Sequence, residues 1–456
     1  MLGCVKLSGI LMTNTAAATE LDAFYPIRPE CQADIPKTRF KIKPGKTLSA
    51  RRWDAAFSKD GHLDIAKVLR RIHRGGIHPS IKGAVWEFLL GCYDPNSTFE
   101  ERNGIRRQRR EQYGIWKDEC QKMVPIIGTG RFITTAIVTE DGRPVEEERS
   151  RNLQEIDTVG TSSRSSLDAN NSALDKKVTE WKLTLHQIGL DVVRTDRALV
   201  YYENEANQAK LWDILAVYAW IDGEVGYIFS RVRQCLKYKS NLQGMNDICS
   251  PIIILLENEA DAFWCFDHAM RRLRENFRCS TGTIGVQSQL STLSQVIKIV
   301  DPKLHQHLEE LDGGEYLFAF RMLMVLFRRE FSFVDSLYLW EMMWAMEYNP
   351  NMFLSYESGS ASKGGAGTSG NDKHLKQFGK FERKNVKMGS NDQQLPLPVF
   401  LVASVLETKN KRILKEAKGL DDVVNILGDV TGNLDAKKAC NEALKLHKKY
   451  LSKIKN

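Results

Sequence analysis

The sequence lacks any apolar run that could cross a membrane. The longest unbroken run, Ile214 to Ile221, is far shorter than the ~20 residues that span a bilayer, and so is Ile252 to Leu256. The start of the chain, Met1 to Ala18, has an apolar patch at Gly9 to Met12, but this patch is short and Lys6 precedes it. A signal peptide needs a longer apolar region. We therefore expect a cytoplasmic protein with at most a peripheral place on endomembranes.

Closely spaced metal-binding or disulfide-forming residues are also absent. The nine cysteines are an odd number, are spread along the chain and include no Cys-x-x-Cys pair, so we expect reduced thiols. His305 and His307 are two positions apart, which places them on different sides of a helix. The sequence therefore predicts no metal site.

A nucleotide-binding loop and a nucleic-acid-binding arm are missing as well. Gly45-Lys46-Thr47 resembles the end of a phosphate-binding loop, but Phe40 stands where that motif needs a glycine, so a surface turn is expected. The net charge of +8 is not gathered into an arginine-rich arm or an aromatic-studded patch, and we expect no nucleic-acid partner. A weak attraction to anionic membranes or to an acidic partner is compatible with this charge.

What the sequence does contain is helical periodicity, which dominates from residue 63 to residue 454. No strand alternation recurs over several segments, so the predicted fold class is all-α. Residues 1–65 read as an irregular lead-in, 66–350 as the main helical domain, 351–396 as a low-complexity linker, and 397–456 as C-terminal helices packed on the same domain. Within the main domain we expect a disordered loop at about 140–178, because serines, asparagines and few apolar residues cannot bury enough surface.

Three further expectations concern individual helices. Val286 to Leu311 has the pattern of a single amphipathic helix. Two helices are rich in basic residues, and for both we expect a solvated face. These residues are Arg106, Arg107, Arg109 and Arg110 in one helix, and Lys445, Lys448, Lys449 and Lys453 in the other.

Two short stretches carry the residues suited to chemistry. Ile188 to Thr195 contains Arg194, a planar cation with five donors, and Gln243 to Asp247 begins with an amide that can donate and accept at once. Transfer of a phosphoryl group to water needs a positive charge beside the phosphate oxygens and a dipole that orients the attacking water. Arg194 and Gln243 are therefore the candidate catalytic pair.

These stretches resemble the TBC-domain family of Rab GTPase-activating proteins. The resemblance rests on Ile-x-x-Asp-x-x-Arg-Thr at Ile188 to Thr195, on Leu211 to Leu215, on Gly226-Tyr227, and on Gln-Gly-Met-Asn-Asp at Gln243 to Asp247. It implies a two-lobed helical TBC-type domain over residues 66–350. It also implies that an arginine finger, Arg194, and a glutamine finger, Gln243, act in trans on GTP bound to a Rab protein. The protein would then regulate vesicle traffic.

The resemblance also assigns supporting roles and partners. GTP and Mg²⁺ would belong to the partner Rab, and the chain would have no cofactor of its own. Asp191 is expected to cap the next helical turn and so to fix the direction of Arg194. The supporting residues of the two finger motifs are Ile188, Asp191, Thr195, Arg197, Tyr227, Gly244 and Asp247.

The chain departs from the family pattern at one place. In the family, Tyr-x-Gln-Gly-Met is contiguous, whereas here the 14 residues Phe229 to Leu242 separate Tyr227-Ile228 from Gln243. One interpretation is that this insertion, residues 229–242, bulges out and leaves Gln243 in reach of the site. Another is that it comes from a variant transcript that impairs activity. The alternative function is then a non-catalytic Rab-binding adaptor on the same scaffold.

Overall fold

Helices account for all the regular structure in the computed structural model of the protein. The model describes residues 21–139, 143–145, 168–222, 244–277, 285–349, 378–379, 383, 397–429 and 434–454. Within these ranges the extended pairs are isolated bridges, such as Ile27 with Leu199, and none grows into a strand. The predicted all-α class is confirmed.

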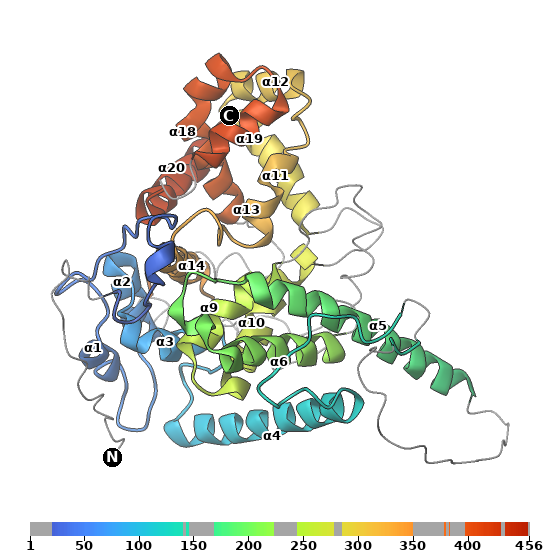
Figure 1. Cartoon of the computed structure of the whole chain (residues 1–456). Helices are drawn as coiled ribbons and strands as arrows, with labels where there is room; N and C mark the ends of the chain where they lie inside the picture. The colour runs from blue at the N-terminus through green and yellow to red at the C-terminus, as the bar shows by residue number, and fades with distance from the viewer. Residues whose placement is uncertain are drawn as a thin grey trace, which may run out of the picture.

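The first lobe is built from the N-terminal and central helices (Figure 1). Here α5 packs on α6, and α10 contacts α4, α6 and α9. The short η3 (Val200–Glu203) connects α5 to α6. The helices of this lobe are α1 (Ala50–Asp54), α2 (Ile65–Gly75), α3 (Lys82–Leu89), α4 (Phe99–Met123), α5 (Asp168–Arg194), α6 (Glu205–Ile221), α9 (Met245–Leu255) and α10 (Glu259–Phe277).

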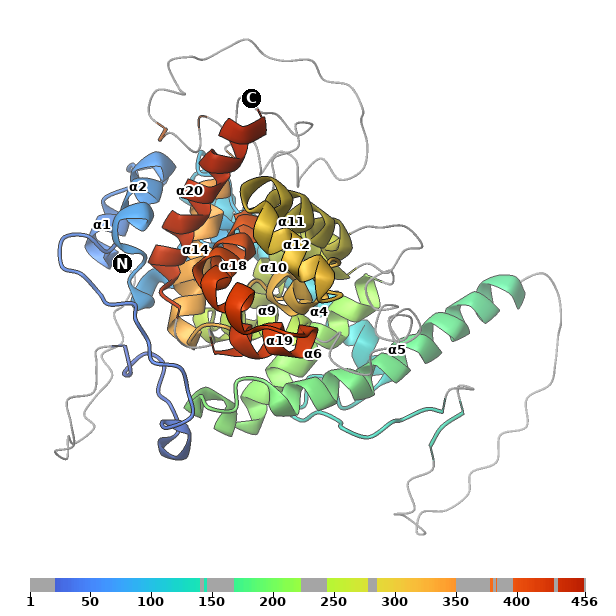
Figure 2. The same cartoon turned by 90° about the horizontal axis from the view of Figure 1, so that it is seen from above.

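The second lobe forms the upper part of Figure 1. In it α18 packs on α11, α19 and α20. Its helices are α11 (Val286–Val300), α12 (Pro302–Glu310), α13 (Phe320–Met324), α18 (Leu397–Glu416), α19 (Leu420–Gly428) and α20 (Ala436–Ile454). Between the lobes lies α14 (Phe333–Glu347), which contacts α2 and α3 on one side and α20 on the other. Figure 2 shows α20 running beside α14, with α2 and α18 on its two sides.

A buried ion pair joins α3 to α14. Lys82 at the start of α3 donates to Oε1 of Glu341 in α14 at 2.5 Å, and Trp86 Nε1 donates to the same oxygen at 3.1 Å. Both charged side chains are completely buried. Burial lowers the pKa of Lys82 and raises the pKa of Glu341, and the two charges oppose these shifts in each other. Removing either side chain would therefore leave the other as a buried charge without a partner.

The predicted loop at 140–178 is wrong at its C-terminal end, because α5 already begins at Asp168. The first residues of α5 are polar, but they extend a helix that has already formed. Each added residue gains a backbone hydrogen bond without the cost of nucleating a new helix. Contacts on α6 hold the middle of α5, where Lys177 Nζ lies 3.9 Å from the ring centroid of Trp220 and Trp181 packs on the same ring. Residues 146–167 lie outside the described residues, as does most of 351–396.

The helix predicted for Val286 to Leu311 is two helices, because Asp301-Pro302 breaks it. Asp301 accepts a hydrogen bond from the backbone N–H of Leu304 at 3.1 Å and so caps α12, and Pro302 takes the first helical position. Proline has no N–H to continue the preceding helix, and its fixed φ favours the start of the next.

The expectation of a solvated arginine face on α4 is wrong for Arg106, Arg109 and Arg110, whereas Arg107 is exposed as expected. Arg110 forms two hydrogen bonds with Asp261 of α10, at 2.9 and 2.6 Å, and Arg106 lies 3.5 Å from Glu87 of α3. Arg109 stacks on Trp264, with the guanidinium carbon 5.3 Å from the ring centroid. These arginines therefore tie α4 to its neighbours, with carboxylate or aromatic partners.

Among the described helices, none combines the length and the apolar character that crossing a bilayer requires. The described cysteines are free thiols.

Replacing Lys82 with Met should destabilise the protein by roughly 3–5 kcal/mol, because Glu341 is left buried without a counter-charge. Chemical denaturation measures the loss. The double variant Lys82→Met/Glu341→Gln should recover much of it, since the glutamine amide is uncharged and keeps an acceptor for Trp86. Equal losses in the single and double variants would show that the charge of Glu341 is not the cause.

Candidate functional site

The site begins at the last two turns of α5. Ile188 and Val192 are buried and anchor the helix to the core. Between them, Gly189 lies so close to the backbone of Ile133 that a Cβ atom would be 1.8 Å from the carbonyl oxygen. A glycine is needed there because the clash would be with backbone, which cannot move aside cheaply. The helix ends at Arg194, whose direction is thus set by well-packed residues.

Asp191 holds Arg194 directly. The two are three residues apart on the same helix face, and the Arg194 guanidinium donates to the Asp191 carboxylate. Asp191 lies inside α5, so the prediction that it caps the next turn is wrong, although it does fix the direction of Arg194. Burial raises the pKa of Asp191 to about 6, against the opposing effect of the Arg194 hydrogen bond and charge.

The two motifs meet at Thr195. Its hydroxyl donates to the backbone oxygen of Asp191 at 2.7 Å and accepts from Nδ2 of Asn246 at 2.8 Å. Asn246 lies in the first turn of α9 and is buried. A side-chain hydrogen bond therefore connects the residue after Arg194 to the third residue after Gln243.

A second connection is made by Asp196, which follows in the chain. Asp196 has a φ of +41°, a left-handed conformation that is uncommon for a residue other than glycine. Its carboxylate accepts from the hydroxyl of Ser250 in α9 at 2.6 Å and from the guanidinium of Arg328. Ser250 in turn accepts from the hydroxyl of Tyr202 at 2.7 Å. The turn after Arg194 is thus fixed by side chains from three other segments.

Asp247 in α9 forms an ion pair with Arg329. Nε and Nη2 of Arg329 donate to one oxygen of Asp247, at 3.1 and 2.8 Å. Arg328 and Arg329 follow a turn in which Leu326 and Phe327 have φ values of +47° and +59°. Such strain persists only where the surroundings hold it, and here Trp340 Nε1 donates to the Leu326 oxygen at 2.8 Å.

Six of the residues described above line a cavity of 480 Å³, namely Arg194, Asp196, Asn246, Asp247, Arg328 and Arg329. The lining also includes Tyr25, Ile27, Ile35, Pro36 and Thr38, from the segment predicted as a lead-in. Residues 25–38 of that segment form no α-helix but are held in place by backbone hydrogen bonds. Arg28 N donates to Ala198 O at 2.9 Å, and Val200 N donates to Pro26 O at 2.9 Å.

Of the three arginines that line the cavity, Arg194 is the most accessible. Its side chain is 46% exposed, against 28% for Arg329 and 7% for Arg328. Leu190 and Val193, on the last turns of α5, are 40% and 41% exposed. An accessible cation beside two exposed apolar side chains is suited to contact with another molecule.

The other predicted site residues have different positions. Arg197 is exposed and does not line the cavity. Gly244 precedes the first residue of α9, and a Cβ there would be 2.4 Å from a methyl carbon of Val325. Tyr227 and Gln243 lie outside the described residues, and so does the insertion 229–242.

The residues that hold the site together were not among the candidate site residues of the sequence. They are Asp196, Asn246, Ser250, Arg328 and Arg329. No local sequence signal pointed to the arginines, because their partners Asp196 and Asp247 lie 132 and 82 residues away in the chain. The described part of the chain holds no group of three or more His, Cys, Asp or Glu side chains placed to bind a metal ion.

The model of the Rab-GTPase-TBC domain family matches residues 148–356, the part of the chain that carries both motifs. The chain therefore contains a Rab-GTPase-TBC domain. Its fold is similar to the crystal structure of the Ypt/Rab-GAP domain of Gyp1p, with a TM-score of 0.53 and 17% identity. That likeness covers 86% of this chain and 96% of the Gyp1p domain.

Curated TBC-family proteins from several organisms are similar in sequence. Rab GTPase-activating protein 22 of Arabidopsis thaliana is 26% identical over 87% of this chain and 79% of its own length. TBC1 domain family member 17 of Homo sapiens is 29% identical over 69% of this chain. The matched region is 39% of the human protein, so the chain spans well under half of that relative.

Replacing Asp191 with Asn should raise stability at neutral pH. The ordinary pKa of this carboxyl is 3.8 and the folded value is about 6, so the unfolded chain releases the proton first as pH rises. Ionised Asp191 therefore costs folding free energy, and the cost appears as pH rises from about 4 to 6. We expect the variant to gain roughly 1–3 kcal/mol over the wild type above that range and little below it.

Denaturant unfolding at a series of pH values measures this difference. The matched control is Asp421→Asn at an exposed position in α19, for which we expect no such pH-dependent gain. A constant difference between Asp191→Asn and wild type across the range would contradict the raised pKa.

Proposed function

We propose that the chain accelerates GTP hydrolysis by a Rab GTPase in trans, with Arg194 as an arginine finger and Gln243 as a glutamine finger. The proposal rests on how the Arg194 side chain is placed. It pairs with Asp191, yet it is about half exposed where it lines a cavity. A finger must be held in one direction and still reach a separate molecule. In this proposal GTP and Mg²⁺ belong to the Rab, and the chain acts in vesicle traffic.

Arg194 would stabilise negative charge on the transferred phosphoryl group. Nη2 is engaged with Asp191, and within the described residues the guanidinium makes no other hydrogen bond. Its remaining N–H groups are therefore free to donate to phosphate oxygens. Leu190 and Val193 would supply apolar contact with the surface of the Rab around its nucleotide.

Gln243 would orient the attacking water. Support comes from its neighbour Gly244, which leads into α9, and from Asn246, which bonds Thr195 beside Arg194. The chain on both sides of residues 223–243 is anchored, since Asp222 pairs with Arg274 at 2.7 Å before them and α9 follows them. We propose that the insertion 229–242 bulges out. Closing a longer loop costs only ~(3/2)RT ln n, so the fold tolerates it.

Replacing Arg194 with Ala or with Lys should each lower Rab activation by ~10³- to 10⁵-fold, the usual contribution of an arginine finger. Lysine fails because it lacks the planar fork of donors. The assay is single-turnover GTP hydrolysis across a panel of Rab proteins. The control is Arg412→Ala, because Arg412 is 43% exposed and also ion-paired, with Asp429 and Glu416, but lies in α18. Near wild-type activity in Arg194→Lys would argue against the finger role.

Deleting residues 229–242 tests the second finger. If the insertion bulges out, both the full chain and the shortened one should accelerate hydrolysis, and Gln243→Ala should reduce the activity of each. Activity in the shortened chain alone would refute the bulge. Binding of GTP-loaded Rab without faster turnover in either form would identify a non-catalytic adaptor.

A further inference from the structure

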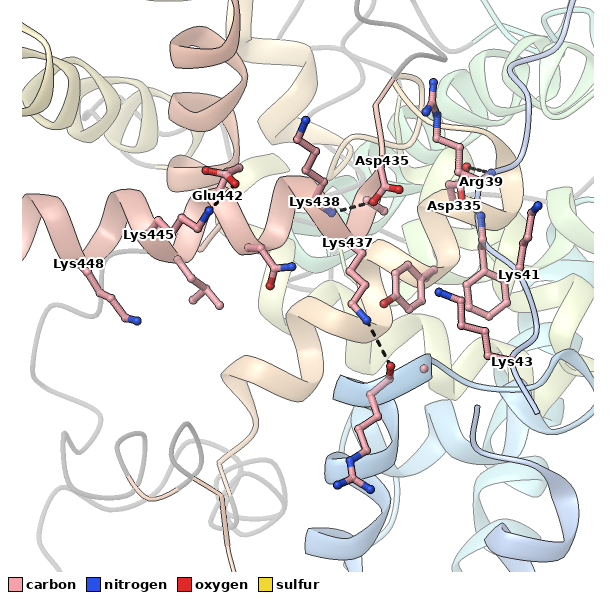
Figure 3. Close-up of a pocket in the computed structure, with 17 residues that line it drawn as sticks. Arg39, Lys41, Lys43, Asp335, Asp435, Lys437, Lys438, Glu442, Lys445 and Lys448 are labelled. Atoms are coloured by element: carbon pink, nitrogen blue, oxygen red, sulfur yellow. Dashed lines mark hydrogen bonds and ion pairs between the residues drawn. The ribbon is translucent and has the colours of Figure 1, made fainter. Parts of the chain in front are cut away.

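A second cavity, of 590 Å³, lies on α20 and is strongly basic. Eight lysines and arginines line it, against three carboxylates. It is formed by four parts of the chain, which are the segment 39–43, the end of α2, α14 and the first turns of α20 (Figure 3). A solvated lysine face would lie on a single helix, so the gathering of cations from separate segments needs another explanation.

The N-terminal wall of this cavity is built to present cations. Arg39, Lys41 and Lys43 are exposed, and Phe40 between the first two is buried. The segment is pinned by Asp335 of α14, whose carboxylate accepts from the backbone N–H groups of Arg39 at 2.8 Å and Phe40 at 2.7 Å. This carboxylate is therefore occupied by backbone donors.

The opposite wall is α20. Lys437, Lys445 and Lys448 lie along one side of the helix, at spacings of eight and three residues. Figure 3 shows the side chains of Lys437 and Lys43 extending toward one another from the two walls. Lys437 Nζ donates to the backbone oxygen of Arg74 at 3.3 Å, which closes the cavity at the end of α2.

Most of this positive charge is not neutralised within the described residues. Asp435 accepts from the backbone N–H of Lys438 at 2.7 Å and so caps α20, and Glu442 pairs with Lys445 at 2.8 Å. No described carboxylate forms an ion pair with Lys41, Lys43 or Lys448. On α4, by contrast, Arg106 and Arg110 have carboxylate partners.

Gathering like charges without counter-charges destabilises a fold, so such a cluster indicates a ligand that supplies the missing negative charge. The lysines act as mobile point charges, which suits several phosphate groups set around a small ring. The floor is apolar, since the rings of Phe40 and Tyr338 pack with centroids 5.0 Å apart. A volume of 590 Å³ is within the usual range for small-molecule sites, roughly 300–1,000 Å³.

We propose that this cavity binds a compact polyphosphate of the inositol phosphate class, either free or as the headgroup of a phosphoinositide lipid. The site is separate from Arg194 and does not depend on Rab activation. It gives the protein a means of sensing a soluble inositol polyphosphate or of contacting a membrane that carries the lipid form.

The test compares two triple variants of the full chain. Lys41→Gln/Lys43→Gln/Lys448→Gln neutralises exposed lysines of the cavity. Lys411→Gln/Lys415→Gln/Lys418→Gln removes the same charge near the C-terminal end of α18, which lies beside α12, where Ile413 O contacts His307. All six positions are exposed, so both proteins should fold, and circular dichroism checks this.

Calorimetry with inositol hexakisphosphate should show binding by the wild type that weakens as salt rises. The cavity variant should bind on the order of 10- to 100-fold more weakly, and the control within about twofold. No binding by the wild type, or equal losses in both variants, would overturn the proposal. Equally tight binding of an acidic peptide would also overturn it, and would point to a protein segment as the ligand.

Vesicles distinguish the two sources of the phosphates. Flotation with phosphatidylinositol bisphosphate vesicles, compared with phosphatidylserine vesicles of equal total charge, identifies the lipid form if the wild type binds the first more strongly and the cavity variant does not. Binding of the soluble polyphosphate without this vesicle preference assigns the site to the free form.

Discussion

The buried carboxylate of Glu341 is the constraint on which the arrangement of the helices depends. Its partner Lys82 lies 259 residues earlier, so the pair forms only when α3 and α14 are in register. Asp335, six residues before Glu341 on the same helix, holds the backbone of Phe40 from 295 residues away. Two carboxylates on one buried helix thus fix the N-terminal part of the chain against its C-terminal half.

The same helix positions both cavities. Residues just before and at its start, Ser332 to Val334, line the cavity beside Arg194, while Asp335 and Tyr338 line the basic one. The region around Arg194 contains groups that cost folding free energy, which are a buried aspartate with a raised pKa and non-glycine residues with positive φ. Such strained or desolvated groups persist at sites because the surrounding packing holds them.

The sequence was informative where chemistry depends on local spacing. The three-residue separation of Asp191 and Arg194 places both on one helix face, and periodicity identified most of the helices. It was less informative where a contact joins distant segments. Nothing near Arg328 or Arg329 in the chain indicates that they face Asp196 and Asp247, because these pairs are 132 and 82 residues apart. Helix ends were misjudged for a different reason, since Pro302 and the continuation of α5 depend on local backbone geometry rather than on hydrophobic pattern.

The segment between Ile35 and Lys43 lines both cavities. Thr38 lines the cavity beside Arg194 and donates a hydrogen bond to Ser332 at 3.2 Å, whereas its neighbour Arg39 lines the basic cavity. A shortened form of the protein that starts after this segment would keep every described α-helix and yet lose part of the wall of both cavities. The functional unit is therefore larger than its helical scaffold.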